Sequence, residues 1–143
     1  MSDVVLDSCV VTKWFLAESD SDQAEALFNA LISGGGKIFV LDIVFTEVAN
    51  ALWKRQRRKL IKAGEETTLL EDLMQLPLTV VESANLLPLA MEIAVKYDRS
   101  VYDSLFVALV HKSGLPGITT DERLYNATHH DFPQIMLLQD WSG

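Results

Sequence analysis

Four acidic residues in this chain stand where a strand ends or a helix begins, rather than along a solvated helix face. Elements in that order would present all four at the same end of an α/β sheet. Carboxylates that share a pocket repel one another unless a cation lies between them. Hard divalent ions such as Mg²⁺ and Mn²⁺ take oxygen ligands, so the pattern predicts a metal site. Its candidate ligands, and candidate catalytic residues, are Asp7, Glu47, Asp103 and Asp121.

Carboxylates around Mg²⁺ or Mn²⁺ suit the hydrolysis of phosphodiesters. The metal lowers the pKa of a bound water and stabilises charge on the phosphate oxygens, so no serine or cysteine nucleophile is needed. Ser8 and Thr119 lie close in sequence to two of the acids. Their hydroxyl groups can orient a carboxylate or a metal-bound water.

Each acid taken alone also has an ordinary structural explanation. Asp121 can be a helix N-cap, and Asp103 can be an acid in the first turn of a helix, where the dipole favours its charge. Asp7 can be a turn residue, and Glu47 can be a surface residue. These explanations stay open beside the shared metal site.

Strand and helix patterns alternate along the chain. This alternation predicts right-handed crossovers and a three-layer α/β/α sandwich with a mostly parallel central sheet, formed by one domain over residues 1–143. The expected strands are Val4–Leu6, Ile38–Leu41, Leu78–Val81, Gly117–Thr120 and Ile135–Leu138. The expected helices cover about 22–33, 44–60, 65–75, Leu86–Tyr97, Tyr102–Ser113 and Glu122–Ala127, with a short helix or turn at Val10–Leu16. The expected N-caps are Ser21 or Asp22 for the first of the long helices and Asp42 for the next.

Composition narrows the class of protein. The chain has 143 residues and a net charge of −8, which argues against a generally basic nucleic-acid binder but not against a nuclease with acidic catalytic groups. No apolar run approaches the ~20 residues of a membrane span, and no secretory signal is visible. Cys9 is the single cysteine and has no partner for an internal disulfide. We therefore expect a cytoplasmic protein with no membrane segment.

The segments around the four acids resemble a known family. Residues 4–15, 45–52, 101–109 and 118–124 are similar, in order and spacing, to the acid-bearing segments of PIN-domain proteins. The resemblance is closest to the VapC-like toxin ribonucleases of prokaryotic toxin–antitoxin pairs. It implies a Mg²⁺- or Mn²⁺-dependent endoribonuclease that acts on RNA, forms a homodimer and is neutralised by a cognate antitoxin. It also implies that Asp7, Glu47, Asp103 and Asp121 hold the metal.

One position departs from the family pattern. Cys9 stands where the family often has a small polar residue, two places after the first acid, which weakens any hydroxyl or amide contribution there. An alternative function is a non-catalytic PIN-like module that binds RNA or protein. A phosphatase of the haloacid-dehalogenase type is disfavoured because the stretch Asp7–Cys9 lacks the second aspartate. A phosphoacceptor receiver is disfavoured too, since neither its acidic pair nor its late lysine is evident.

Half of the basic residues are concentrated in one stretch. This stretch can contact RNA phosphates or an acidic antitoxin segment, or it can be an ordinary helix end whose cations favour the dipole. Arg123 can likewise reach a substrate phosphate or form a surface ion pair. The stretch contains Lys54, Arg55, Arg57, Arg58, Lys59 and Lys62.

Overall fold

The strands form one parallel sheet in the order β3-β2-β1-β4-β5. The structure is a computed structural model that describes residues 3–142. The predicted domain 1–143 thus includes residues 1, 2 and 143, which lie outside the described part. The strands are β1 Val4–Leu6, β2 Ile38–Leu41, β3 Thr79–Val81, β4 Gly117–Thr119 and β5 Ile135–Leu137. Every strand-to-strand pairing in these residues is parallel, in line with the expectation of a mostly parallel sheet.

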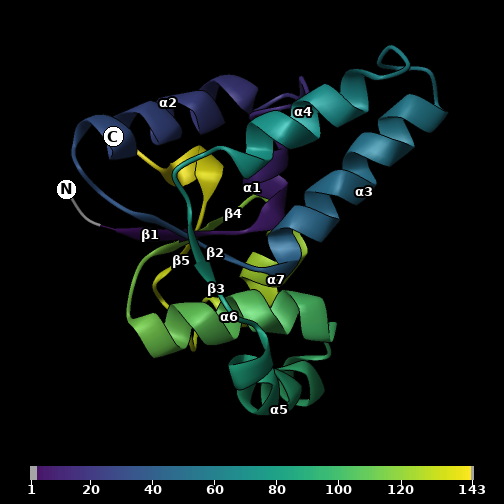
Figure 1. The fold of residues 1–143 in the computed structure, drawn as a ribbon. Helices are drawn as coiled ribbons and strands as arrows, with labels where there is room; N and C mark the ends of the chain where they lie inside the picture. The colour runs from purple at the N-terminus through teal and green to yellow at the C-terminus, as the bar shows by residue number, and fades with distance from the viewer. Residues whose placement is uncertain (1–2, 143) are drawn as a thin grey trace.

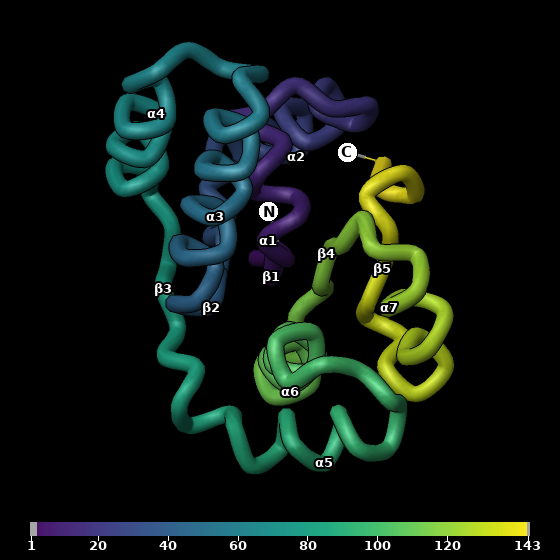
Figure 2. Tube along the Cα trace, turned by 90° about the vertical axis from the view of Figure 1, so that its right-hand side faces the viewer, coloured from purple at the N-terminus to yellow at the C-terminus, as the bar shows by residue number. Residues whose placement is uncertain are grey.

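Helices cover both faces of this sheet. Helices α1 to α4 lie on one face, and α5 and α6 lie on the other, with α7 beside β5 (Figures 1 and 2). The predicted three-layer α/β/α architecture is confirmed. The helices are α1 Ser8–Thr12, α2 Ser21–Ser33, α3 Ile43–Arg57, α4 Glu65–Met74, α5 Leu87–Tyr97, α6 Val101–Ser113 and α7 Glu122–Thr128, with short 3₁₀ turns at Ala84–Leu86 and Leu138–Asp140.

The order of the strands reverses beside β1. The chain passes from β1 outward to β2 and β3, and then returns to place β4 and β5 on the other side of β1. The register pairs Val5 with Gly117 and Leu6 with Ile118. At the end of β1 the N–H of Asp7 donates to the carbonyl of Ile118 at 3.1 Å. The junction of β1 and β4 is therefore the switch point at which open α/β sheets bind ligands.

Helix α6 is the buried element that crosses under the sheet. Its residues from Ser104 to Val110 are all buried, and α5 packs along its outer side. Gly117 on β4 makes this close approach possible. A Cβ built on Gly117 would lie 2.2 Å from Cγ2 of Val110 and 3.0 Å from Cζ of Phe106. Because Gly117 has no side chain, α6 can lie close to the sheet, and with it Asp103 in its first turn.

The predicted helix over 44–60 is wrong at its end. Helix α3 stops at Arg57, and Lys59 then adopts a left-handed conformation with φ of 59°. The N–H of Leu60 donates back to the carbonyl of Arg55 at 2.9 Å, which closes the helix end. Trp53 and Leu60 are exposed. Packing of an apolar face supplies most of the stability of a helix in a protein. Because Trp53 and Leu60 are exposed, a further turn of α3 would gain no such packing.

The predicted helix starts and N-cap residues were also partly wrong. The short helix predicted at Val10–Leu16 is α1, Ser8–Thr12, because Asp7 caps it two residues earlier. Asp42 makes no cap bond; its Oδ2 accepts instead from the N–H of Ser83 at 3.3 Å. The N-cap position of α2 is Asp20, also without a side-chain bond, so neither Ser21 nor Asp22 is the cap. The hydroxyl of Ser21 instead accepts from the N–H of Glu18.

The strands Val4–Leu6 and Ile38–Leu41 match their predicted bounds, and the remaining elements differ by one residue at one end, which is the usual uncertainty of an element end. None of the helices within residues 3–142 combines the length and the apolar character needed to cross a membrane.

Substitution of Gly117 by alanine should destabilise the fold. The added methyl group meets Val110 and Phe106, which the buried helix α6 holds in place, and overpacking of this kind costs about 1–3 kcal/mol. Denaturant unfolding followed by circular dichroism measures the change. Gly34→Ala is the matched control, because Gly34 is exposed with φ of −83°, and it should shift the free energy of unfolding by no more than about 0.5 kcal/mol. Equal stability of the two variants would contradict the proposed contact.

Candidate active site

Two of the predicted acids flank the switch point of the sheet. Asp7 directly follows β1, and Asp121 lies two residues beyond the end of β4. The hydroxyl of Thr119 donates to Oδ2 of Asp7 at 2.8 Å and accepts from the N–H of Asp121 at 3.1 Å. Thr119 is fully buried. One hydroxyl therefore ties the carboxylate after β1 to the backbone after β4.

Both acids also cap a helix, as the structural alternative for Asp121 proposed. Oδ1 of Asp7 accepts from the N–H of Ser8 at 2.9 Å, and Oδ1 of Asp121 accepts from the N–H of Leu124 at 3.1 Å. Each cap holds its carboxylate in one orientation, because the helix N–H group is fixed. Capping and a place in a shared pocket are thus compatible in both residues.

Glu47 and Asp103 approach the same edge from opposite layers. Glu47 lies at the start of the second turn of α3, one residue further into the helix than the predicted helix start at 44 would put it. Asp103 lies in the first turn of α6, where the hydroxyl of Ser100, the N-cap, accepts from its N–H at 3.1 Å. Because α6 is buried over most of its length, the position of Asp103 is fixed by core packing.

The charges of the four acids act on one another. Burial raises the pKa of Asp7 to about 6, against hydrogen bonds from Thr119, Ser8 and Cys9 and with a further rise from the charge of Asp103. Burial and then the charge of Asp7 raise the pKa of Glu47 to about 6, and the hydroxyl of Ser8 opposes the rise.

Asp103 completes the set. Burial raises its pKa first, and the charge of Asp121 raises it further, while Arg99 lowers it. Asp7 is coupled to Glu47 and Asp103, and Asp103 to Asp121. The structure therefore brings all four predicted acids into one electrostatic field, in which their ionised forms repel one another.

The chemistry of these donors fits a hard divalent cation. Carboxylate oxygens are the preferred ligands of Mg²⁺ and Mn²⁺, and a bound cation would relieve the mutual repulsion. Within the described residues, however, no three His, Cys, Asp or Glu side chains converge closely enough to hold an ion as they stand. The carboxylates that could bind such a cation are present, but in this structure their oxygen atoms do not converge on one position.

Cys9 is built into the support of Asp7. Its Sγ lies 3.5 Å from Oδ2 of Asp7 and 3.4 Å from the hydroxyl of Thr119, and it accepts from the N–H of Thr120 at 3.3 Å. Burial, followed by the charge of Asp7, raises the pKa of the thiol to about 12. The thiol thus stays protonated and acts as a weak donor to the carboxylate. The sequence pointed to a lost polar group here, whereas the structure shows a contact that a thiol can make.

A cavity of about 390 Å³ opens beside Glu47. Ser8, Cys9 and Thr120 form the part of its wall nearest Asp7, and Lys13 and Glu18 form the outer part. Glu18 pairs with Lys13 at 3.5 Å and with Arg55 at 3.3 Å. Sequence inspection missed Lys13 and Glu18, because their pairing depends on the approach of α3 to the loop after α1.

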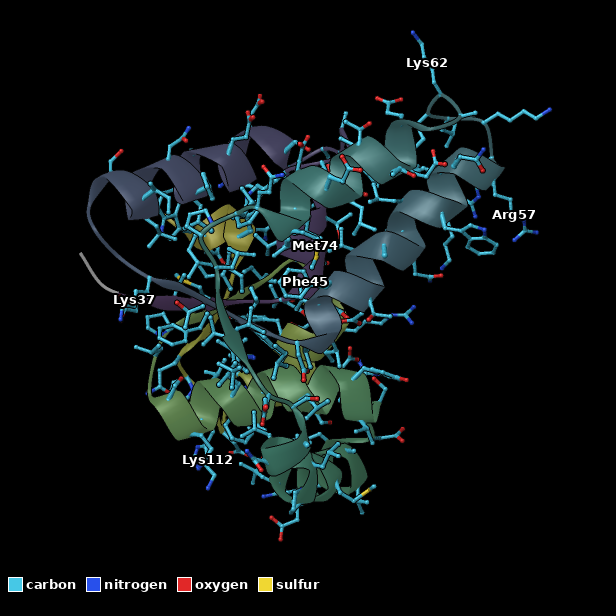
Figure 3. The ribbon with its side chains drawn as sticks, in the orientation of Figure 1. Lys37, Phe45, Arg57, Lys62, Met74 and Lys112 are labelled. Carbon is cyan, nitrogen blue, oxygen red and sulfur yellow. The ribbon has the colours of Figure 1, made fainter. Side chains whose placement is uncertain are left out.

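The predicted basic contact residues are divided by the fold. Arg55 turns toward Glu18, and the guanidinium of Arg57 lies over the ring of Trp53 at 5.3 Å. Figure 3 shows Arg57 and Lys62 at the outer end of the α3–α4 hairpin, pointing into solvent. Lys54 and Arg58 are exposed as well. The stretch is therefore not one continuous surface facing the acids.

Comparison with known proteins decides the family. The family model described as PIN domain matches residues 4–129. The chain belongs to the PIN-domain family. This PIN domain is 34% identical over 123 residues to Ribonuclease VapC3 of Pyrobaculum aerophilum, covering 85% of this chain and 91% of the relative.

Two solved structures show the same fold. One is VapC20 of Mycobacterium tuberculosis, a sarcin-ricin loop cleaving toxin, with a TM-score of 0.69, 15% identity, and coverage of 88% of this PIN domain and 95% of that chain. The other is a toxin–antitoxin complex from Klebsiella pneumoniae, with a TM-score of 0.67, 13% identity, and coverage of 95% and 98%.

The buried carboxylate of Asp7 should make stability depend on pH. Its folded pKa of about 6 exceeds the ordinary value of 3.8, so the folded state binds its proton more tightly than the unfolded state. Stability from this group is full below about pH 4 and is lost as the pH rises through 6. In EDTA, Asp7→Asn should match the wild type near pH 4 and exceed it at pH 7.5 by roughly 2 kcal/mol.

Urea unfolding across this pH range, with and without Mn²⁺, provides the measurement. Mn²⁺ at pH 7.5 should stabilise the wild type and leave Asp7→Asn unchanged, since the ion offsets the buried charge. Asp72→Asn, in the exposed part of α4, is the control and should follow the wild type in every condition. Parallel pH profiles for Asp7→Asn and wild type would show that Asp7 is not the titrating group.

Proposed function

We propose that this PIN domain is a metal-dependent endoribonuclease of the VapC toxin kind, which hydrolyses RNA phosphodiester bonds. The observation that carries the proposal is the set of four carboxylates near the switch point of the sheet, in which the charge of Asp7 acts on Glu47, that of Asp103 on Asp7, and that of Asp121 on Asp103. The name of the relative from P. aerophilum, a ribonuclease, supports the same activity. The cleavage of the sarcin-ricin loop by VapC20, which shares this fold, supports RNA as the substrate.

The residues have distinct parts in this proposal. Asp7, Glu47, Asp103 and Asp121 hold Mg²⁺ or Mn²⁺, which when bound supplies an activated water and charge neutralisation at the phosphate. Thr119 fixes Oδ2 of Asp7 and so sets the direction in which this carboxylate faces.

Two further contacts support the carboxylates, and both come from Ser8. Its backbone N–H fixes Oδ1 of Asp7 at 2.9 Å, and its hydroxyl stabilises the charged form of Glu47. Without a cation, the pKa values of Asp7 and Glu47 are raised to about 6, so both carboxyl groups bind a proton more readily than an ordinary surface acid does.

We also infer a cognate antitoxin as the protein partner. The K. pneumoniae structure is a toxin–antitoxin complex, and the chain with this fold covers nearly the whole of this PIN domain. The exposed cations Lys54, Arg57 and Arg58 remain candidates for contact with RNA or with an acidic antitoxin segment.

One observation favours the alternative of a non-catalytic module that binds RNA or protein. Within the described residues the acidic side chains do not close around a common point. A module that never binds a metal would retain that geometry. The two functions differ in whether RNA is cut in the presence of Mg²⁺ or Mn²⁺.

Cleavage of total cellular RNA by purified protein tests the catalytic proposal. We expect discrete fragments with Mn²⁺ or Mg²⁺ and none with EDTA. Asp7→Asn and Asp103→Asn should each lower the cleavage rate by at least about 100-fold, because each removes a metal ligand. Asp72→Asn is the charge-matched control and should cleave at the wild-type rate. Wild-type rates from Asp7→Asn would refute the assignment, and intact RNA throughout would support the binding module.

We further propose that α5 mediates homodimerisation. Leu87, Met91 and Val95 form a stripe at four-residue spacing that is 44%, 54% and 78% exposed. Glu92 and Lys96 border this stripe and are exposed. In an antiparallel pair of α5 helices about a two-fold axis at Met91, Leu87 of one copy meets Val95 of the other. The stripe is thus self-complementary in apolar character, as an isologous interface requires.

Met91→Glu should convert the dimer to a monomer. The substitution places two carboxylates near the two-fold axis in an apolar contact. Size-exclusion chromatography with light scattering gives the mass of the species in solution. Leu60→Glu, an exposed apolar residue in the loop after α3, is the control and should stay dimeric. A monomeric wild type, or a dimeric Met91→Glu, would exclude α5 as the interface.

A further inference from the structure

A second cavity, of about 490 Å³, lies on the other side of the acids. It is bounded by the C-terminal end of α5, the turn into α6 and the outer side of α7. The catalytic proposal uses no residue of this cavity. Its lining consists of Tyr97, Asp98, Arg99, Arg123, Asn126 and Ala127.

Two arginines face this cavity without a carboxylate partner. The ion pairs within 4.0 Å among residues 3–142 are Lys13–Glu18 and Arg55–Glu18, so neither Arg99 nor Arg123 is paired there. Asp98 lines the same cavity but lies beyond that distance from both guanidinium groups. Guanidinium groups with free donors match a phosphate diester in shape and in charge.

Arg99 is held in place by its own turn. Asp98 has a left-handed conformation, with φ of 55°, and ends α5. The N–H of Arg99 donates to the carbonyl of Ala94 at 3.2 Å, and its Nε–H donates to the carbonyl of Asp98 at 3.1 Å. One edge of the guanidinium is thereby fixed, while its remaining donors are directed away from that carbonyl. Less side-chain entropy is lost on binding than for a freely rotating arginine.

Tyr97, which lines the cavity, is also held in place. The hydroxyl of Tyr97 donates to the carboxylate of Asp131, and the Tyr97 ring meets that of Phe132 edge to face at 5.8 Å. Helix α7, which carries Arg123, begins at the Asp121 cap. Arg123 is therefore presented by a helix that begins at one of the acids, and Arg99 by a turn that directly follows the fixed Tyr97.

Two residues that line the cavity lie close in sequence to two of the acids. Arg99 precedes Asp103 by four residues across the start of α6, and its charge acts on that carboxylate. Arg123 follows Asp121 by two residues in the first turn of α7. On the opposite side, Lys13 and Arg55 share the single carboxylate of Glu18. Arg99 and Arg123 are thus the cations close in sequence to Asp103 and Asp121 that have no acidic partner within 4.0 Å among residues 3–142.

We propose that Arg99 and Arg123 form a subsite for a non-scissile phosphate of the RNA strand. The inference rests on the proposed function, since it assigns the path of the substrate away from the scissile bond. A strand held at the carboxylates must carry its next phosphate past one flank of Asp103 and Asp121. On a chain of net charge −8, a pair of unpaired guanidinium groups at that flank offsets the repulsion that this phosphate meets.

Binding of a fluorescently labelled single-stranded RNA oligonucleotide in EDTA tests the subsite apart from cleavage. Arg99→Gln and Arg123→Gln should each weaken binding about tenfold, as expected for the loss of a charge-assisted contact. Each should also reduce the slope of log affinity against log salt by about 0.7, the value for one phosphate of a single strand. Lys112→Gln is the control with the same loss of charge. It lies at the far end of α6 from Asp103, toward the lower left in Figure 3, and should bind like the wild type.

Steady-state cleavage with Mn²⁺ supplies the second measurement. The arginine variants should raise KM more than they lower kcat, and Arg99→Lys should recover part of the affinity. If the wild type cuts no RNA but the arginine variants bind RNA more weakly than it does, the subsite is upheld and the catalytic function is rejected. Cleavage with unchanged binding and KM in both variants would reject the subsite alone. If the arginine variants bind RNA like the wild type but no longer bind an acidic protein partner, the proposal is overturned in favour of a peptide-binding site.

Discussion

The hydroxyl of Thr119 is the contact on which the acidic site depends. It donates to the carboxylate after β1 and accepts from the backbone after β4, so it joins the two halves of the sheet where their order reverses. A buried carboxylate without a cation is costly, and each hydrogen bond to it offsets part of that cost. The layers of helices hold the strands in the register that keeps this hydroxyl within reach. The site thus holds buried like charges close together within a well-packed frame.

The fold followed from the sequence because its signals are local. Alternating strand and helix patterns define a parallel sheet, and glycines and prolines mark where the elements end. The acids could be placed for the same reason, since Asp7 and Asp121 directly follow strands whose carboxyl ends share an edge. Helix ends were less predictable. The end of α3 depends on whether the residues after Trp53 find anything to pack against, and Asp42 bonds to Ser83, which is distant in sequence.

The rest of the site rests on contacts that no spacing reveals. Glu18 neutralises Arg55 across 37 positions, so a dense basic stretch in the sequence contributes less free charge near the acids than its composition indicates. Arg99 lies four residues before Asp103 in the sequence. Its exposure to a cavity follows from the left-handed turn at Asp98, a conformation uncommon for a residue other than glycine. Sequence patterns can propose the reactive groups, but they do not reveal the counter-charges around them.

Cys9 has a consequence for the durability of this site. Oxidants and alkylating reagents attack the thiolate and not the thiol, and the thiol of Cys9 keeps its proton because burial and the neighbouring carboxylate raise its pKa to about 12. A cysteine at this position would otherwise expose the acidic cluster to oxidative damage. Burial and, after it, the charge of Asp7 therefore keep this sulfur in its less reactive protonated form, and the protein can carry a cysteine beside Asp7 without becoming a redox sensor.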